Sequence, residues 1–236
     1  MRQLHLRFTP ASGNQPLFAL QWRKAVSEQM TRTGRSPAAA HRLFHHWHEF
    51  CPEEASGRDK AGVCFVSSTR WVGVIASGDE SIQLLREHMT EFVLAANAAL
   101  GACAVEHHDR VLNFVPGNRL YDYVIPQHVS KDHDGQPHTT AFLHGKIVRA
   151  LNDWAERFEL EPAFTSGDIL ITNFQRLSPA MNWSRTSERW AKHRTRVEFS
   201  MPFKLDGYWA AGSLASKGYS FVQFARSPVD SEGGVQ

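Results

Sequence analysis

Two rounds of the same strand and helix order predict an α+β protein made of tandem ferredoxin-like domains. An alternating strand opens the chain at residues 3–8, a long amphipathic helix covers 79–100, and a strand–helix–strand order begins again after Pro116-Gly117-Asn118. Two β-α-β-β-α-β units in tandem explain this order most economically. We expect a first domain at residues 1–117, a second at 118–227 and a disordered tail at 228–236.

In the first half, the spacing of apolar residues separates helices from strands. The segment 79–100 has an acidic start and then places apolar side chains on one face, as an amphipathic helix does. In the first helix, Leu17, Leu20, Lys24 and Ser27 lie at turn spacing. The helices expected in this half are 16–30, 38–50 and 79–100, and the strands are 3–8, 62–67, 71–76, 102–107 and 111–115.

The second half is a degenerate copy of this plan. An amphipathic helix is expected at residues 142–158, where Ile147, Leu151, Trp154 and Phe158 form one apolar stripe. A glycine-rich loop within 206–217 takes the place of a full second helix. The strands expected in this half are 120–125, 168–174, 197–205 and 221–224.

The charge of the chain is nearly balanced overall but concentrated in one segment. The formal net charge of +2 is not that of a typical nucleic-acid-binding protein. Residues 183–196, however, contain Glu188 as their only acid and five cations: Arg185, Arg189, Lys192, Arg194 and Arg196. If this segment is a helix, four of the cations share one face, and Trp183 and Trp190 share another. We therefore predict a nucleic-acid-binding helix, and a solvated helix face is the alternative.

A glycine-rich loop lies close to the end of the sequence, which reads GSLASKGY at 212–219. Glycine lets the backbone approach an anion closely, and Lys217 adds a positive charge. The spacing is not that of a P-loop, because the loop lies between two strands. We expect a polyanion to contact Gly212, Ser216, Lys217 and Gly218, and a plain glycine-serine turn is the alternative.

The histidines at 41–48 allow a second chemistry. His41 and His45 are one helical turn apart and could bind zinc, although no HExxH motif is present. Acid–base catalysis is also possible because histidine titrates near neutral pH, and a helix without any chemistry is the third possibility. On balance, we expect neither a metal ion nor a cofactor.

The three cysteines and the hydropathy pattern bear on location. Cys51, Cys64 and Cys103 lack CxxC spacing, so we expect neither a disulfide framework nor a zinc ribbon. No apolar run reaches the roughly 20 residues of a membrane helix, and no signal peptide opens the chain. A reducing, cytoplasmic location is expected.

The paired ferredoxin-like folds, the arginine-rich segment and the glycine-rich loop before a last strand resemble a known group of proteins. These are the CRISPR-associated repeat-processing endoribonucleases of the RAMP superfamily, whose domains are RRM-like. The segment SKGYSFV at 216–222 is similar to the Ser-Lys-Gly-aromatic tail of their compact, hairpin-reading members, such as those of type I-F.

The resemblance implies a metal-independent endoribonuclease of CRISPR RNA maturation. The ribose 2′-OH attacks the phosphorus and leaves a 2′,3′-cyclic phosphate and a 5′-OH. The partners that the resemblance implies are the repeat RNA stem-loop, gripped by the basic helix, the mature crRNA, and other subunits of a CRISPR effector complex.

One departure from the family concerns catalysis. Compact members carry a catalytic histidine on the first helix, a few residues after a Leu-Phe pair. Here Leu17-Phe18 is followed at the matching place by Arg23. Arginine is a poor base, but it can stabilise a phosphorane. Arg23 is therefore the first catalytic candidate, Arg35 and His41 come next, and such atypical residues would fit a less common type such as type IV.

Two other functions stay open at this point. One is a non-catalytic RAMP subunit that holds a guide RNA without cutting it. The other is a histidine-dependent metalloenzyme built on residues 41–51.

Overall fold

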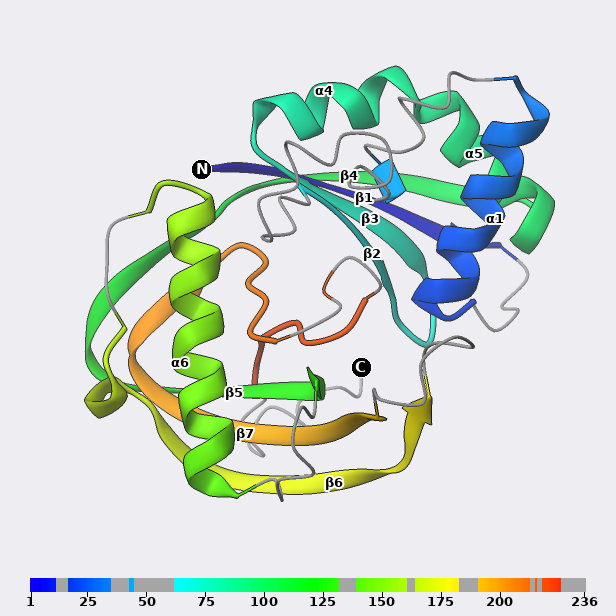
Figure 1. Ribbon diagram of the computed structural model, residues 1–236. Coiled ribbons are helices and arrows are strands. Elements are labelled where there is room, and N and C mark those ends of the chain that lie inside the picture. Colours follow the sequence, from blue (N-terminus) through cyan, green and yellow to red (C-terminus); the bar gives the residue numbers. More distant parts are fainter. Residues whose placement is uncertain are drawn as a thin grey trace, which may run out of the picture.

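Two four-stranded antiparallel sheets form the framework of the computed structural model (Figure 1). The structure describes residues 1–11, 17–34, 43–44, 62–131, 139–160, 164–182, 191–212, 215 and 218–225. The predicted helix at 38–50 lies outside this range apart from Leu43 and Phe44, and so does the predicted tail.

Over the described residues the first domain has the predicted order of elements, except that the strand expected at 111–115 is not part of it: Val111 ends its last strand, and residues 113–115 begin a strand of the second sheet. Its strands are β1 (Arg2–Pro10), β2 (Val63–Ser67), β3 (Val72–Ser77) and β4 (Cys103–Val111), and its helices are α1 (Ala19–Arg32), α4 (Asp79–Glu87) and α5 (Met89–Leu100). The strands lie in the order β2-β3-β1-β4, with β1 paired to both β3 and β4. The helices cover one face of this sheet (Figure 1).

The predicted amphipathic helix at 79–100 is two helices. His88 ends α4 and precedes α5, and its backbone (φ −107°, ψ 16°) is not helical. Both halves still bury apolar residues against the sheet, Ile82 and Leu85 from α4 and Phe92 and Ala96 from α5. The apolar residues keep helical spacing across the break at His88, so the sequence pattern did not reveal the break.

The residues predicted at turn spacing on α1 do not form its buried face. Leu20 is partly exposed and Lys24 is exposed, whereas the buried face consists of Ala19, Trp22, Val26 and Met30. The Trp22 indole N–H donates to the carbonyl oxygen of Gly73 at 3.1 Å, and its ring lies against Phe8. Trp22 therefore anchors the helix to the sheet.

The second domain repeats the topology of the first. It consists of β5 (Asn113–Lys131), α6 (Thr140–Arg157), a 3-10 turn η1 (Ser166–Asp168), β6 (Leu170–Asn182), β7 (Ala191–Asp206) and β8 (Gln223–Phe224). The sheet order β6-β7-β5-β8 corresponds position by position to that of the first sheet. The fold prediction of tandem ferredoxin-like domains is thus confirmed.

β5 is longer than the strand predicted at 120–125. It begins at Asn113 and continues past Gly117, with a register shift against β7 between Pro116 and Tyr121. The two sheets therefore divide the chain at Leu112, a few residues before the boundary expected at 117. α6 starts at its N-cap Thr139, whose hydroxyl accepts from the Phe142 amide, and buries Leu143, Ile147, Leu151 and Trp154.

The described residues among 207–222, here called the strap, follow β7 where α4 and α5 follow β3 in the first domain. In Figure 1 they run in orange and red between the two domains. The strap folds back on itself: the amide of Ala211 donates to the carbonyl of Ser220, and that of Val222 donates to Trp209. Trp209, Ala210 and Ala211 lie in the core of the second domain.

Strands β1, β2 and β3 of the first sheet are buried between its helices and the second domain, whereas the edge strand β4 is mostly exposed. The side chains of Cys64, Val66 and Ile75 belong to the same apolar cluster as α6 and the strap. The alternate residues of β1 on that side, Gln3 and His5, are polar but buried. The polar half of the opening strand therefore faces the other domain rather than solvent.

Candidate nucleic-acid interface

The basic segment is not a helix over the part that the structure describes. Residues 191–196 belong to β7, which pairs with β5 on one side and β6 on the other. Lys192 is one of these residues. Arg194 and Arg196 share one face of the sheet, because residues two apart in an extended strand point to the same side. The spacing of the cations at 192, 194 and 196 fits the period of two of a strand as well as that of a helix. The segment is a strand because it is hydrogen-bonded to β5 and β6 on its two sides. Arg185 and Arg189 lie outside the described residues.

Arg194 and Arg196 differ in their surroundings. Arg196 is exposed, and its guanidinium donates to the Glu198 carboxylate at 2.8 and 3.0 Å. Arg194 is half-buried and lies close enough to Tyr219 to affect its titration. Burial raises the pKa of Tyr219, and the positive charge of Arg194 opposes this shift. The basic strand and the glycine-rich loop are therefore neighbours.

The two outer glycines of the loop sit where a side chain would not fit. Gly218 has φ +87°, and a Cβ there would overlap that of Ala19 on α1 and lie 2.9 Å from the carbonyl oxygen of Phe65. A Cβ on Gly212 would lie 2.6 Å from the hydroxyl oxygen of Ser220. The loop thus packs against the first domain through Gly218. Ser216 and Lys217 lie outside the described residues.

Arg23 lies half-buried on α1, where the sequence predicts it. Its guanidinium donates to the carbonyl oxygen of Phe44 and lies 5.4 Å from the centroid of that ring. These contacts hold the charged group in one place on the helix surface. The other catalytic candidates, Arg35 and His41, lie outside the described residues.

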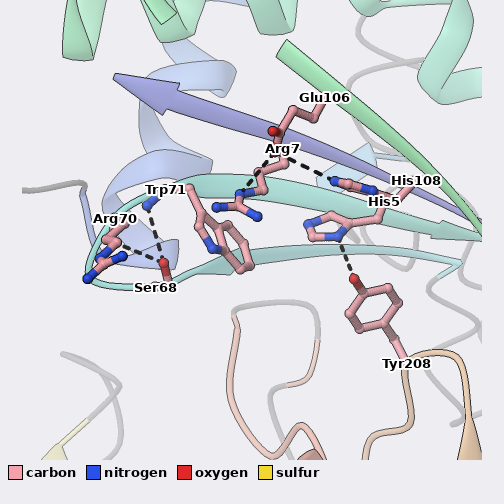
Figure 2. Close-up of polar contacts among 8 residues, drawn as sticks. All are labelled: His5, Arg7, Ser68, Arg70, Trp71, Glu106, His108 and Tyr208. Atoms are coloured by element: carbon pink, nitrogen blue, oxygen red, sulfur yellow. Dashed lines mark hydrogen bonds and ion pairs between the residues drawn. The ribbon is translucent and has the colours of Figure 1, made fainter. Parts of the chain in front are cut away.

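A cluster that the sequence interpretation missed lies on the side of the first sheet that faces the second domain (Figure 2). His5 and Arg7 come from β1, Glu106 and His108 from β4, and Tyr208 from the strap. His5 Nδ1 and the Tyr208 hydroxyl are 2.6 Å apart. Arg7 Nε and His108 Nε2 lie 3.4 and 3.6 Å from the Glu106 carboxylate.

His5 is neutral at neutral pH. Its pKa is lowered to about 4, mainly by burial and further by the positive charges of His108, Arg7 and Arg110. Burial also raises the pKa of Tyr208, against a hydrogen bond with the Arg110 side chain. The neutral pair joins β1 to the strap, and the exposed Arg110 can contact an anion. The strict polar alternation of residues 3, 5 and 7 was the signal for this cluster.

Trp71 completes the cluster at the turn between β2 and β3. The guanidinium carbon of Arg7 lies 5.1 Å from the centroid of its ring, and the His5 ring packs edge-on at 5.2 Å. The Ser68 hydroxyl accepts from the amides of Arg70 and Trp71, which fixes the turn (Figure 2). An open pocket of about 410 Å³ lies beside the cluster, lined by Arg2, Asp109, Arg110, Val111, Asp206 and Gly207.

The predictions about metals, cysteines and membranes concern other parts of the chain. Within the described ranges, no group of three or more His, Cys, Asp or Glu side chains could hold a metal ion. The segment with His45 and Cys51 lies outside those ranges. Cys64 and Cys103 are free thiols. Among the helices that the structure describes, none is long and apolar enough to cross a membrane.

Comparison with known proteins places this architecture in a family. The model of the family described as type IV CRISPR-associated endonuclease Csf5 matches residues 1–226. No curated protein matches the chain. A solved structure described as "Csf5, CRISPR-Cas type IV Cas6 crRNA endonuclease" superposes with a TM-score of 0.72 at 20% identity, covering 96% of this chain and 100% of that one.

More distant solved structures share the fold. A crystal structure of Cas6b has a TM-score of 0.58 at 12% identity, over 95% of this chain and 100% of its own. A Cas6 product complex has a TM-score of 0.52 at 12% identity, over 96% and 100% of the two chains. The predicted resemblance to CRISPR-associated endoribonucleases is confirmed, and the chain belongs to the Csf5 family of type IV CRISPR-associated endonucleases.

Proposed function

We propose that this protein is an endoribonuclease that binds the repeat hairpin of CRISPR precursor RNA and cleaves it to mature crRNA. The observation that carries the proposal is the family match, which spans residues 1–226 and both sheets. The likeness in fold to a Cas6 product complex supports an RNA substrate.

The reaction that we propose needs no metal ion. The 2′-oxygen of the ribose loses its proton and bonds to the adjacent phosphorus, while the bond from phosphorus to the 5′-oxygen breaks. The leaving 5′-oxygen takes up a proton, and the upstream product ends in a 2′,3′-cyclic phosphate. The protein holds the three reacting atoms in line and stabilises the negative charge on the phosphorane.

Arg23 is the proposed stabiliser of that charge. Its side chain is held by the Phe44 carbonyl and ring, and a preorganised cation is worth more to a transition state than a mobile one. Arg35 and His41 are proposed as the further catalytic groups. The RNA backbone is proposed to run over Arg194 and the strap, and the product to stay bound for delivery to other effector subunits.

The test is cleavage of a labelled repeat RNA in excess EDTA under single-turnover conditions. We expect one cut per repeat, with a cyclic phosphate and a 5′-OH at the ends. A 2′-deoxy substitution upstream of the cut should abolish cleavage without weakening binding, because it removes the nucleophile alone. Loss of cleavage in EDTA, restored by a divalent ion, would contradict the metal-independent mechanism.

The role of Arg23 is tested by Arg23→Ala and Arg23→Lys. We expect the alanine variant to cleave roughly 100-fold or more slowly while binding the repeat nearly as well, because one transition-state contact is worth about 3 kcal/mol. Arg86→Ala, which removes an exposed arginine from the end of α4, is the matched control and should cleave normally. Normal cleavage by Arg23→Ala would exclude Arg23.

A non-catalytic guide-RNA-binding subunit is the second candidate. It is favoured by the absence of histidine from α1 and by the engagement of Arg23 with a backbone carbonyl. Tight binding of the repeat without any cut would support this function. Elemental analysis that finds zinc, together with absence of RNA binding, would point to the metalloenzyme instead.

A further inference from the structure

Phe18 is the most exposed large apolar side chain in the described part of the chain. Its exposed fraction is 76%, and the next highest is 59% at Val111. The preceding Leu17 packs against the core of the first domain, so the chain turns one side chain of the pair inward and the other outward. Phe18 contributes little to the fold, and its surface is available to a ligand.

The backbone of Phe18 is rigid although its side chain is exposed. It is the N-cap residue of α1; its amide donates to the Gln21 side chain at 3.1 Å, and its carbonyl accepts from the Trp22 amide at 2.9 Å. Trp22 is itself fully buried and bonded to Gly73. The ring therefore projects from an ordered helix start, which lowers the entropy that a ligand must remove on binding.

Phe18 lies beside the loop and the catalytic candidate already described. Ala19, the next residue, is the one whose Cβ a side chain on Gly218 would overlap. Tyr219 follows Gly218 and has Arg194 close by. Arg23 is little more than one turn further along the helix, and the first turn of α1 contains no acidic residue. The exposed ring thus stands at the start of the helix that carries Arg23, next to the residue on which Gly218 of the loop packs.

These surroundings favour a nucleobase over a protein partner. A protein interface needs a contiguous apolar patch, whereas Gln21 and Lys24 on the exposed part of α1 are polar. Leu20 is partly exposed, but two residues along a helix put it on the other side of the axis. A single exposed aromatic ring on the helix that carries Arg23 suits one unpaired base, which stacks on the ring.

We propose that Phe18 stacks on one unpaired base of the repeat RNA and so selects where the hairpin is held relative to Arg23. The inference rests on the proposed function, because it specifies a contact of the same substrate. It makes Phe18 a specificity-determining residue that does not take part in the chemistry.

The experiment combines a protein variant with an RNA variant. Phe18→Ala should bind the repeat roughly 5- to 100-fold more weakly, as loss of one stacked base predicts. Phe18→Trp should restore binding, and Leu94→Ala, which trims another exposed apolar residue on α5, is the control and should bind normally. All variants should melt at the wild-type temperature, since the ring is not packed.

A double-mutant cycle pairs Phe18→Ala with an abasic substitution at each unpaired position of the repeat RNA in turn. At one position, the abasic change should weaken binding to the wild type but cause no further loss in Phe18→Ala, because both changes remove the same contact. Wild-type affinity in Phe18→Ala would overturn the inference, as would additive losses at every position. Failure of the wild type itself to bind the repeat would instead overturn the proposed function.

Discussion

The two domains share one strand order but cover their sheets differently. In the first domain, α4 and α5 follow β3 and pack beside α1 on the face away from the second domain. In the second domain, the strap takes that place in the chain. The same topology therefore carries two helices at this place in one domain and, in the other, a segment that is not helical over the described residues 207–212.

The difference matters because a helix uses its backbone groups internally, whereas an irregular segment must bond them elsewhere. The Gln3 side chain donates to the carbonyl of Tyr208 and accepts from its amide, at 3.1 and 2.7 Å. The Val129 amide donates to the Ser220 hydroxyl at 3.0 Å. The strap is thus bonded to β1 of one domain and β5 of the other.

Gly218→Ala is expected to have the largest effect, because it changes how the strap packs on the first domain. The added Cβ would meet Ala19 and Phe65 at a backbone angle that favours glycine, so the strap must move away from α1. We expect a loss of about 3 kcal/mol in the free energy of unfolding, together with weaker RNA binding. Urea unfolding and a gel shift measure the two effects.

Gly145→Ala is the matched control on the regular part of the second domain. Gly145 lies within α6, and nothing would lie within 4 Å of an added Cβ. This substitution should stabilise the protein by up to about 1 kcal/mol, because alanine favours helix. Equal destabilisation by both variants would show that the strap is not tightly packed on α1.

Acid should weaken the contact between β1 and the strap, which the His5 and Tyr208 side chains form. Because the pKa of His5 is about 4 in the folded protein and 6.5 in a free chain, the unfolded state binds its proton first as the pH falls. The free energy of unfolding should therefore decrease between pH 6.5 and 4, by up to about 3 kcal/mol from this group. In His5→Gln this part of the slope should vanish. If the pH dependence of His5→Gln equals that of the wild type, His5 does not titrate in this way. Comparing the two proteins at pH 7.5, where His5 is neutral, measures any loss of packing separately.

Tyr208→Phe should have the smallest effect of the three. It removes the hydroxyl that bonds to His5, and we expect a loss of about 1–2 kcal/mol in the free energy of unfolding. Tyr123→Phe is the comparison within the second domain, where the hydroxyl donates to the Phe203 carbonyl and accepts from the Leu205 amide. If Tyr208 joins the domains, only its variant should also change the cleavage rate.

The sequence predicts most of the strands and helices because burial has a clear period in them. The apolar stripe of α6 is an example, and it is confirmed. β1 is a strand as predicted, although burial does not alternate in it, because residues 3–6 are all buried. The prediction failed for the basic residues at 192–196, because their spacing fits both a helix and a strand. It also failed at His88, where one helix ends and the next begins without disturbing the spacing of the buried residues. On α1, the spacing of Leu20 and Lys24 was misleading, because Trp22 packs on the sheet instead.

The candidate site was only partly predictable for a different reason. Glycine-rich loops and arginine clusters have local signatures, so Gly218 and Arg194 could be named in advance. The cluster around His5 combines β1, β4 and the strap, and its two bonded residues His5 and Tyr208 are 203 residues apart in the chain. Its one local signal, the polar alternation of residues 3, 5 and 7, is equally typical of a strand face that is exposed to solvent.

The sequence by itself determined the fold class, the family resemblance and the residue types available for RNA chemistry, because these follow from local period and motif. The tertiary structure decided which polar face is buried, where the glycines press against the first domain and which aromatic ring stays exposed. Those properties depend on how two sheets meet, and that is set by packing across the whole chain rather than by neighbouring residues.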